Sequence, residues 1–391
     1  MPFSERSVVM LREEFVRLAD EAGCNVSELC RRYGITRRTG YRWLRRYQAE
    51  GPAGLVDRSR RPAASPRRLS AALEELVVAL RLAHPTWGGR KLARRLRDLS
   101  QPDVPAASTV TAVLRRHGLL DGPGAGEPRA FVRFAHDRPN ALWQMDFKGH
   151  VACGTARCHP LTVLDDHSRY NIVLHACADE RTATVRGALV TAFRECGLPE
   201  RIAVDNGPPW GHGPGHPYTP LGVWLLRLGV AVSHSRPYHP QTLGKDERFH
   251  RTLKRDVLRV PLLDLADGQR RFDHWRQVYN YERPHEALGD AVPAARYRPS
   301  DRRYPELLPP LEYAAGDLVR SVLKGGSVSL RGRAVQLPQA FRGERVAFRP
   351  TGQDGHYAVV FATIQIGEVD LTATKRGVSH VSEHMAPISP V

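Results

Sequence analysis

Three acidic residues lie where carboxylates could hold metal ions. Asp146 lies in the apolar run WQMDF, Asp205 ends the run RIAVD, and Glu247 lies in the long polar segment QTLGKDERFHRTLK. Carboxylates and water are the ligands that Mg²⁺ prefers. Two such ions about 3.5–4 Å apart can activate the attacking oxygen and stabilise the leaving oxygen of a phosphodiester displacement. The acids therefore indicate metal-dependent phosphodiester chemistry, against the simpler interpretation that they are solvated surface groups.

The segments around these acids predict an α/β fold. The β-rich runs are LWQMDFKGH, HPLTVLDDHSRY, NIVLHACA, RIAVDNG and VAVSHSRP. The helical runs are RTATVRGALVTAFRECG, VWLLRLG, QTLGKDERFHRTLKRDVLR and RRFDHWRQVYNYERP. Their alternation along the chain is typical of a layered α/β architecture. One acid within a strand, one at a strand end and one on a helix across the sheet can face a single crevice.

Five motifs in this region are more specific than the acids alone. They are, in order, WQMDFKG, LTVLDDHSRY, AVDNGPPW, SRPYHPQTLGKDERFHRTLK and YNYERPHEALG. Together they resemble the integrase-type catalytic core of bacterial insertion-sequence transposases, part of the retroviral-integrase-like Asp-Asp-Glu superfamily. The resemblance covers residues 141–300 closely. It implies an RNase H-like core over 140–300, DNA-strand transfer, and two Mg²⁺ (or Mn²⁺) ions per active site.

The resemblance also assigns roles to individual residues. Asp146, Asp205 and Glu247 match the catalytic, metal-binding acids. Asp246 is a close rival of Glu247, but the family motif places Glu before Arg-Phe-His. On a helix Glu247 would share one face with His250, Arg251 and Lys254, which leaves Asp246 rotated away.

The resemblance further implies contacts to the DNA end. Tyr238, Gln241 and Lys245 lie in or beside the segment that matches the mobile active-site loop. Arg251 and Lys254 would lie beside the metals, where phosphates arrive; the alternative is a solvated helix face. Forty-one residues separate Asp205 from Glu247, more than is usual in many relatives, and the excess falls in a Gly/Pro/His-rich loop.

The charge of the chain points to a polyanionic partner. Its 391 residues contain 58 Lys+Arg and 41 Asp+Glu, a net charge of +17. Residues 1–140 contain 26 basic and 15 acidic residues and so hold +11 of this excess, against +4 for 141–300 and +2 for 301–391. Nucleic acid is the leading partner. With 41% apolar residues the chain is too apolar to be disordered.

The front of the chain predicts helix-turn-helix DNA binding within residues 1–50. Ser7, Ser27 and Thr36 are expected to cap three helices, with a tight turn at Gly34. A recognition helix reads the major groove from its N-terminal residues. Arg37, Arg38 and Arg42 are expected at base edges, and Arg45 and Arg46 on phosphates. The alternative is a solvated helical hairpin.

Three further regions complete the expected organisation. A basic linker (51–69) offers Arg60 and Arg61 to DNA, and a second helical, helix-turn-helix-like domain (70–120) begins at the capping residue Ser70. The basic candidates of the second domain are Arg90, Lys91, Arg115 and Arg116. A second linker (121–139) precedes the core. The alternating runs of 310–391 predict a small β-barrel that binds DNA or neighbouring protomers, or else a stabilising cap on the core.

Other metal or reactive sites are weaker hypotheses. Asp165 and Asp166 could compete as metal ligands, yet they fall where a turn between strands is expected. Cys153 and Cys158 have near-zinc spacing without a convincing second half. The loop histidines His212 and His216 could touch DNA or a metal, and are more simply solvated. Cys24 and Cys30 fit buried helix-core positions.

The sequence thus predicts a multidomain DNA transposase. It would bind terminal inverted repeats, cleave the element ends and join the 3′-OH to target DNA. Holding two ends together requires a homo-oligomer on DNA, either a dimer or a tetramer. The sequence contains no P-loop, so any use of ATP would have to come from a partner, an accessory ATPase. Sparse cysteines and the lack of a signal or membrane segment favour a bacterial cytoplasmic location. The alternatives are a regulator on an inactive core and an RNase H-like nuclease without joining activity.

Overall fold

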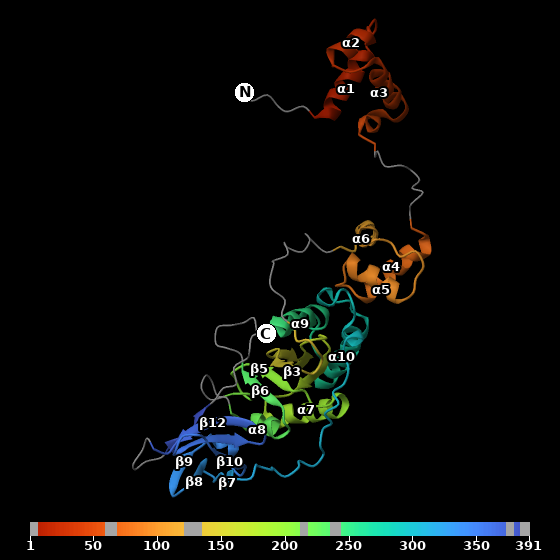
Figure 1. Cartoon of the computed structure of the whole chain (residues 1–391). Coiled ribbons are helices and arrows are strands. Elements are labelled where there is room, and N and C mark those ends of the chain that lie inside the picture. Colours follow the sequence, from red (N-terminus) through yellow and green to blue (C-terminus); the bar gives the residue numbers. More distant parts are fainter. Residues whose placement is uncertain are drawn as a thin grey trace. The chain divides into compact units, whose positions relative to one another are not determined.

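The structure is a computed structural model. It describes residues 7–58, 69–120, 135–211, 218–234, 244–372 and 379–383. The chain forms two compact units, Met1–Arg68 and Leu69–Val391 (Figure 1). The second unit contains another set of helices, a central α/β sheet and a C-terminal pair of β-sheets.

The first unit is a three-helix domain. Its elements are α1 (Val8–Ala19), α2 (Val26–Arg32), α3 (Arg37–Glu50) and the 3₁₀ turn Gly51–Leu55. Ser7 and Thr36 cap α1 and α3 as predicted, but Asn25, not Ser27, caps α2. The Asn25 side chain accepts hydrogen bonds from the backbone N–H groups of Ser27 and Glu28, so Ser27 lies inside the first turn.

The helices of this domain pack closely around Phe15, Cys30 and Trp43, all of which are buried. Gly40 of α3 lies in this contact, where a Cβ would come within 2.5 Å of Cys30 Sγ and 2.9 Å of the Phe15 ring. A glycine at this position therefore allows α3 to cross α2 and α1. Cys30 is a free, buried thiol, as the sequence predicts.

A second three-helix group follows in the second unit. It consists of α4 (Ala71–Ala83), α5 (Gly89–Asp98) and α6 (Ala107–Arg116). Ser70 caps α4 as predicted, since its hydroxyl accepts the N–H of Leu73. Trp87, Leu92 and Leu114 form part of the buried core of this group.

The central sheet has six strands, β1 (Trp143–Phe147), β2 (Val151–Cys153), β3 (Ala156–Asp165), β4 (Asn171–Cys177), β5 (Arg201–Val204) and β6 (Ala231–His234). The path β2-β3-β1-β5-β6 joins five of them, and β4 pairs with β3. β1 runs antiparallel to β3 and parallel to β5, which is parallel to β6. Apart from the short β2, the order of strands and helices is the predicted one.

Different helices cover the two faces of this sheet. The helices are α7 (Thr182–Cys196), α8 (Pro220–Arg227), α9 (Gly244–Asp256) and α10 (Leu265–Gln277), the last followed by the π-helical turn Val278–Glu282. Side chains alternate along a strand. Trp143 and Met145 of β1 accordingly join one apolar cluster with α7 and α8, whereas α9 and α10 join another with β3 and β4. Asp146 thus points to the face opposite Met145.

The C-terminal strands form two sheets. One has the order β14-β12-β11-β10-β7 and the other β13-β9-β8. The strands are β7 (Leu318–Ser321), β8 (Ser327–Leu330), β9 (Arg333–Gln336), β10 (Arg345–Pro350), β11 (His356–Phe361), β12 (Ile364–Asp370), β13 (Ser379–His380) and β14 (Ser382–Glu383). The described strands close no single barrel, so the barrel stays a prediction.

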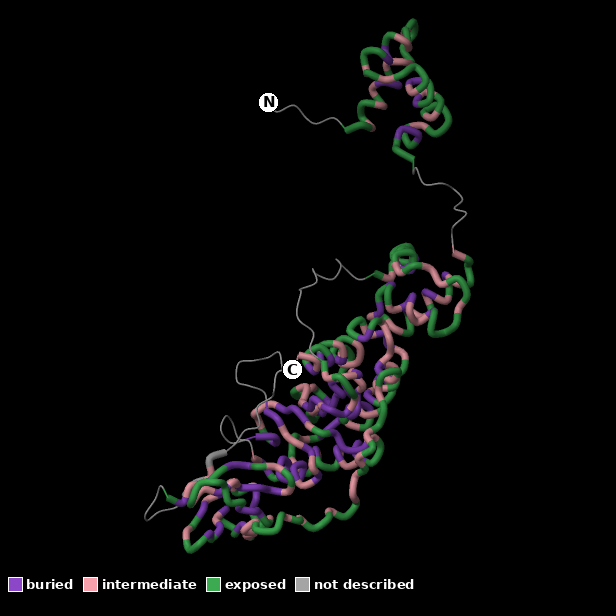
Figure 2. Tube along the Cα trace, in the orientation of Figure 1, coloured by how far each residue is buried: buried purple, intermediate pink, exposed green. Residues whose placement is uncertain are grey.

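The helix α8 joins the C-terminal sheets to the central one. Trp224 and Leu225 belong to the apolar cluster of the central sheet, whereas Val223 and Leu226 belong to that of the C-terminal sheets. Arg227 also pairs with Glu344 at 3.1 Å. A helix that is apolar on every side is buried on every side, and Figure 2 shows buried residues throughout this region.

Candidate active site

Asp146 and Asp205 occupy neighbouring positions on two parallel strands. Trp143 of β1 is paired with Ile202 of β5, and Gln144 with Ala203. Continuing this register brings Asp146 opposite Asp205, which directly follows the last residue of β5. The Asp205 carboxylate also accepts the backbone N–H of Gly207 at 2.9 Å, within the tight turn that ends the strand. The strand pairing therefore places the first two predicted acids side by side.

The proximity of the two acids shows in the pKa of Asp146. Burial, and then the negative charge of Asp205, raise this pKa to about 7. Two carboxylates this close disfavour each other's charge. A divalent cation between them would favour the charged forms of both. In its chemistry and charge, this pair fits a Mg²⁺ or Mn²⁺ ion.

The third acid lies near the start of α9, where two neighbouring acids differ in burial. Glu247 is exposed, whereas Asp246 is fully buried on the core-facing side of the helix together with Phe249, His250 and Leu253. Neither carboxylate oxygen of Asp246 has a hydrogen-bond partner among the described residues. Burial and the charge of Asp146 raise the pKa of Asp246 well above its ordinary value. The expectation that Asp246 turns away from the site is thus wrong, because it faces inward toward Asp146.

The structure brings only part of the predicted metal site together. Among the described residues, no group of three or more His, Cys, Asp or Glu side chains is placed to hold a metal ion. Asp146 and Asp205 are adjacent, and Glu247 lies at the solvent-facing start of α9. Cys153 and Cys158 are buried free thiols within an apolar cluster, and burial raises the pKa of Cys158 to about 12.

A threonine and a histidine support Asp146 from behind. Thr162 is paired with Asp146 across β3 and β1, and its hydroxyl donates to the Asp146 carbonyl at 2.9 Å. The same hydroxyl lies 2.8 Å from His250 Nε2. Since its proton is used on the carbonyl, the hydroxyl oxygen accepts a hydrogen bond from the Nε2–H group. His250 Nδ1 is then the unprotonated nitrogen, 3.9 Å from the Asp146 carboxylate.

Both supporting residues are buried, and burial lowers the pKa of His250 to about 4, so this ring is neutral at pH 7. Thr162 is not among the residues that the sequence motifs single out. The signal that could have found it is the alternation in HPLTVLDD, where the one polar residue of an apolar run lies on the face opposite Leu161 and Val163.

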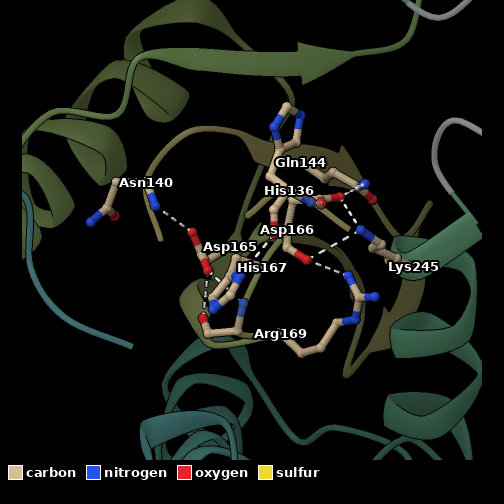
Figure 3. Close-up of polar contacts among 9 residues, drawn as sticks. His136, Asn140, Gln144, Asp165, Asp166, His167, Arg169 and Lys245 are labelled. Atoms are coloured by element: carbon tan, nitrogen blue, oxygen red, sulfur yellow. Dashed lines mark hydrogen bonds and ion pairs between the residues drawn. The ribbon is translucent and has the colours of Figure 1, made fainter. Parts of the chain in front are cut away.

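Asp165 and Asp166 form a structural turn between β3 and β4 (Figure 3). The Asp165 carboxylate accepts the N–H groups of Ser168 and Asn140 at 2.8 and 2.7 Å. The Asp166 carboxylate accepts the side-chain N–H of Gln144 at 2.7 Å and pairs with Lys245. These acids already have protein partners, as expected for a turn rather than a competing metal site.

Lys245 therefore has a partner inside the protein. Its ammonium group reaches both the carboxylate and the carbonyl of Asp166, and its side chain is only 17% exposed. Burial lowers the pKa of Lys245 to about 8, although the charge of Asp166 opposes this shift. The ion pair holds the start of α9 to the β3–β4 turn, so a DNA contact by Lys245 would require this pair to open.

The predicted arginines of α3 divide into exposed and anchored groups. Arg37, Arg38, Arg42 and Arg45 are exposed. Arg46 donates to the Val56 carbonyl at 2.7 Å, and its guanidinium lies over the Trp43 ring, 4.6 Å from the ring centroid. Arg42 also lies over the Trp43 ring, 5.2 Å from its centroid, and Arg45 donates to the Tyr41 carbonyl at 3.4 Å, yet both stay exposed. Arg46 is the less exposed residue that fastens α3 to the segment after it.

The predicted basic residues of the second helical group are also divided. Arg90 pairs with Glu286 at 2.8 Å, and Arg116 pairs with Glu74 at 3.2 Å. Arg115 is exposed and Lys91 is partly buried. On α9, Arg251 and Lys254 are exposed. The remaining predicted contacts lie outside the described residues: Arg60, Arg61, His212, His216, Tyr238 and Gln241.

Comparison with protein families gives matches along most of the chain. A helix-turn-helix domain matches residues 11–63 and a homeodomain-like domain matches 39–114. Integrase core domains match 136–240 and 228–293, and the C-terminal domain of the IS481 transposase family matches 317–377. No helix in the described part of the chain is long and apolar enough to cross a membrane.

Similar individual proteins come from insertion elements and a retrovirus. An uncharacterized protein of insertion element IS476 from Xanthomonas euvesicatoria is 27% identical over 63% of this chain and 71% of its own length. One of insertion element IS407 from Burkholderia multivorans is 27% identical over 41% of this chain and 57% of its own. The Gag-Pro-Pol polyprotein of squirrel monkey retrovirus is 30% identical over 31% of this chain and 6% of its own.

Solved structures give a weaker likeness. The HTLV-2 integrase catalytic core domain in complex with magnesium has a TM-score of 0.32 and 16% identity, covering 41% of this chain and 99% of that one. At this score the likeness supports no conclusion. The matches to protein families are informative, because they occur in a defined order along the chain. Helix-turn-helix modules come first, an integrase core follows, and an IS481-type C-terminal domain comes last. This is the domain order of a bacterial insertion-sequence transposase with an integrase-like core.

Proposed function

We propose that the protein binds the terminal inverted repeats of a mobile element, cleaves the element ends and joins the freed 3′-OH to target DNA. The adjacency of Asp146 and Asp205 at the ends of two parallel strands is the observation that carries this proposal. An integrase core domain matched over the same strands supports it. Such a protein would work in the bacterial cytoplasm, on DNA.

Asp146, Asp205 and Glu247 would hold two Mg²⁺ or Mn²⁺ ions. Ions bound there would activate the attacking oxygen and stabilise the leaving oxygen. Asp246 is a further carboxyl near Asp146, buried and without a hydrogen-bond partner among the described residues. Glu247 would reach the ions from the solvent-facing start of α9 when DNA and metal are bound. Thr162 and His250 would keep Asp146 oriented throughout.

Both chemical steps would use one site. Water first attacks the phosphodiester at the element end, the P–O bond to the leaving strand breaks, and a 3′-OH is released. That hydroxyl then attacks a target phosphodiester and displaces a target 3′-oxygen. In the first step a P–OH bond replaces the P–O3′ ester bond. In the second step a new P–O3′ ester bond replaces the one broken in the target, so no covalent enzyme intermediate is required. The exposed arginines of α3 would provide the contacts that select the end sequence.

A joining assay with labelled end DNA tests the proposal. The purified full chain, end DNA from the flanks of its own reading frame and a target plasmid are incubated with Mg²⁺. We expect a nicked end followed by a joined product, and neither when the Mg²⁺ is chelated. Nicking without joined product would indicate a nuclease. Sequence-specific binding without nicking would indicate a regulator on an inactive core, and either result would overturn the proposal.

A further inference from the structure

Lys91 of α5 is a basic residue without a counter-ion. Its side chain is partly buried, and within the described ranges no ion pair or hydrogen bond is found for it. Its charged neighbours are Arg283, Arg255 and Arg90, with Asp256 as the one acid among them. Burial and these like charges lower the pKa of Lys91 to about 7. Such a cation is stabilised when an anion joins it.

The surroundings of Lys91 are a fixed joint between the second helical group and the catalytic core. Arg95 of α5 pairs with Glu282 at 2.8 Å, and Arg90 pairs with Glu286 at 2.8 Å. Val278 packs against the apolar core of the helical group. Arg255, at the end of α9, reaches the Thr86 carbonyl at 3.5 Å. Contacts on both sides of Lys91 thus hold it against the end of α9.

Positive charge at this joint exceeds negative charge. Asp256 accepts from Arg283 at 3.1 Å, pairs with Arg255 at 3.5 Å and also accepts from Trp275. It is therefore fully used by its own partners. Arg248 lies seven residues before Arg255 on α9. It is exposed and is another charged neighbour of Arg283.

A buried ring nitrogen also lies in this region. His285 Nε2 is inaccessible to solvent and, in the part of the chain that the structure describes, has no hydrogen-bond partner. The charged neighbours of His285 are Arg283, Lys91, Arg169 and Arg248, and burial together with these charges lowers its pKa well below the ordinary value. This nitrogen and the Arg283 side chain are therefore closed to a ligand from solvent, which leaves Lys91 and the exposed arginines of α9 to meet one.

We propose that Lys91, Arg248 and Arg255 form a binding site for a backbone phosphate of DNA, and we name these three residues the joint site. The buried Arg283 adds positive charge beside them. The joint site rests on the proposed function and specifies where the DNA passes from the second helical group to the core. Arg248 and Arg255 lie seven residues apart on one face of α9, whose start carries Glu247. A helix rises 1.5 Å per residue, so about 12 Å of α9 separates Glu247 from Arg255.

The salt dependence of DNA binding tests the joint site. Each phosphate contact contributes about −0.9 to the slope of log affinity against log salt for duplex DNA. We expect Lys91→Met to reduce the magnitude of the slope by about this amount, whereas Lys91→Arg retains it. The matched control is Arg97→Met, which removes one exposed charge from the last turn of the same helix. Arg248→Gln is a second test that leaves the buried part of the joint unchanged.

The outcomes separate this inference from the proposed function. Thermal unfolding of each variant confirms that it is folded before its slope is compared. An unchanged slope for Lys91→Met and Arg248→Gln, or an equal loss for Arg97→Met, would overturn the joint site even if the wild-type chain joins DNA ends. Loss of inorganic phosphate binding by calorimetry with an unchanged DNA slope would identify a free anion as the ligand, and also overturn it. Failure of the wild-type chain to join ends, with the slope change present, would overturn the proposed function alone.

Discussion

At the scale of residues, the proposed chemistry depends on how Asp146 is surrounded. Asp205 lies beside it on the neighbouring strand, Asp246 faces it from α9, and Thr162 and His250 support it. The carboxylates are close enough to disfavour one another's charge. This arrangement predicts both a pH dependence and a role for the supporting residues.

Metal-free protein should lose stability as pH rises toward neutrality. The pKa of Asp146 is raised to about 7, and that of Asp246 is also raised, so the folded state binds more protons than the unfolded chain above about pH 4. The contribution of these groups is therefore largest below about pH 4 and is lost as pH rises through about 7. Melting temperatures without metal should fall across this window, and Asp246→Asn should reduce the fall. Added Mg²⁺ should also reduce it. Identical pH profiles for both proteins would contradict the assigned environment of Asp246.

Removing the Thr162 hydroxyl should impair chemistry more than DNA binding. Thr162→Val leaves the Asp146 carbonyl and His250 Nε2 without their shared partner. Loss of a residue that orients a metal ligand typically costs about 10–100-fold in metal affinity or activity. We expect a loss in this range for Mg²⁺-dependent joining, with end binding unchanged. Thr191→Val is the control, because that hydroxyl also donates to a backbone carbonyl but lies at an exposed position of α7. Equal activity of the two variants would show that Thr162 does not position Asp146.

At the scale of elements, two helices organise the second unit. One of them, α9, presents Glu247, Arg251 and Lys254 to solvent and turns Asp246 and His250 toward β1 and β3. The other, α8, lies between the central sheet and the C-terminal sheets and contributes apolar side chains to both. The C-terminal sheets thus pack on the core through α8.

The double role of α8 can be tested by truncating one side chain. Leu226 is buried among residues of the C-terminal sheets. Leu226→Ala should cost about 2–5 kcal/mol of unfolding free energy, because it removes buried methyl groups and leaves a cavity. Leu323→Ala, at an exposed position in the C-terminal region, should change stability by less than about 0.5 kcal/mol. Denaturant unfolding measures both, and similar values would show that α8 does not join the two parts.

The sequence allowed the elements to be predicted better than their contacts. Ser7, Thr36 and Ser70 were identifiable as caps because each immediately precedes a helical pattern. The cap by Asn25 was missed, since Ser27 two residues later is an equally good capping type. Strand β2 is only three residues long and gives no periodic signal.

The sequence predicts that Asp146 and Asp205 lie close together, but not which other residues surround them. Asp146 and Asp205 could be related because both belong to strands, and the strand register places them together. The inward position of Asp246 could not be predicted, because a carboxylate without a partner is expected in solvent rather than in a core. The partner of Lys245 is Asp166, 79 residues earlier, a tertiary pairing that no local pattern encodes.

At the scale of the whole molecule, charge and organisation agree. The net charge of +17 is concentrated in residues 1–140, which contain the helix-turn-helix domain match. The core holds less net charge, in part because its acids are the proposed metal ligands, and bound cations would offset them when DNA docks. Asp146 and Asp205 form one proposed site in each protomer, whereas a mobile element has two ends.

We therefore expect a dimer or tetramer when end DNA is bound. One site for each end requires at least two protomers in the assembly that joins both ends to a target. Light scattering of the full chain with and without end DNA measures the mass of the complex. A single protomer that joins two ends would refute this expectation.

The most direct test of the account is the joining activity of Asp205→Asn in Mg²⁺. This change removes one of the two adjacent charges and keeps the shape of the side chain. The account predicts normal binding of end DNA and no joined product. Asp354→Asn, at an exposed position in a C-terminal turn, is the matched control and should join DNA like the wild-type chain. Undiminished joining by Asp205→Asn would contradict the assignment of the active site.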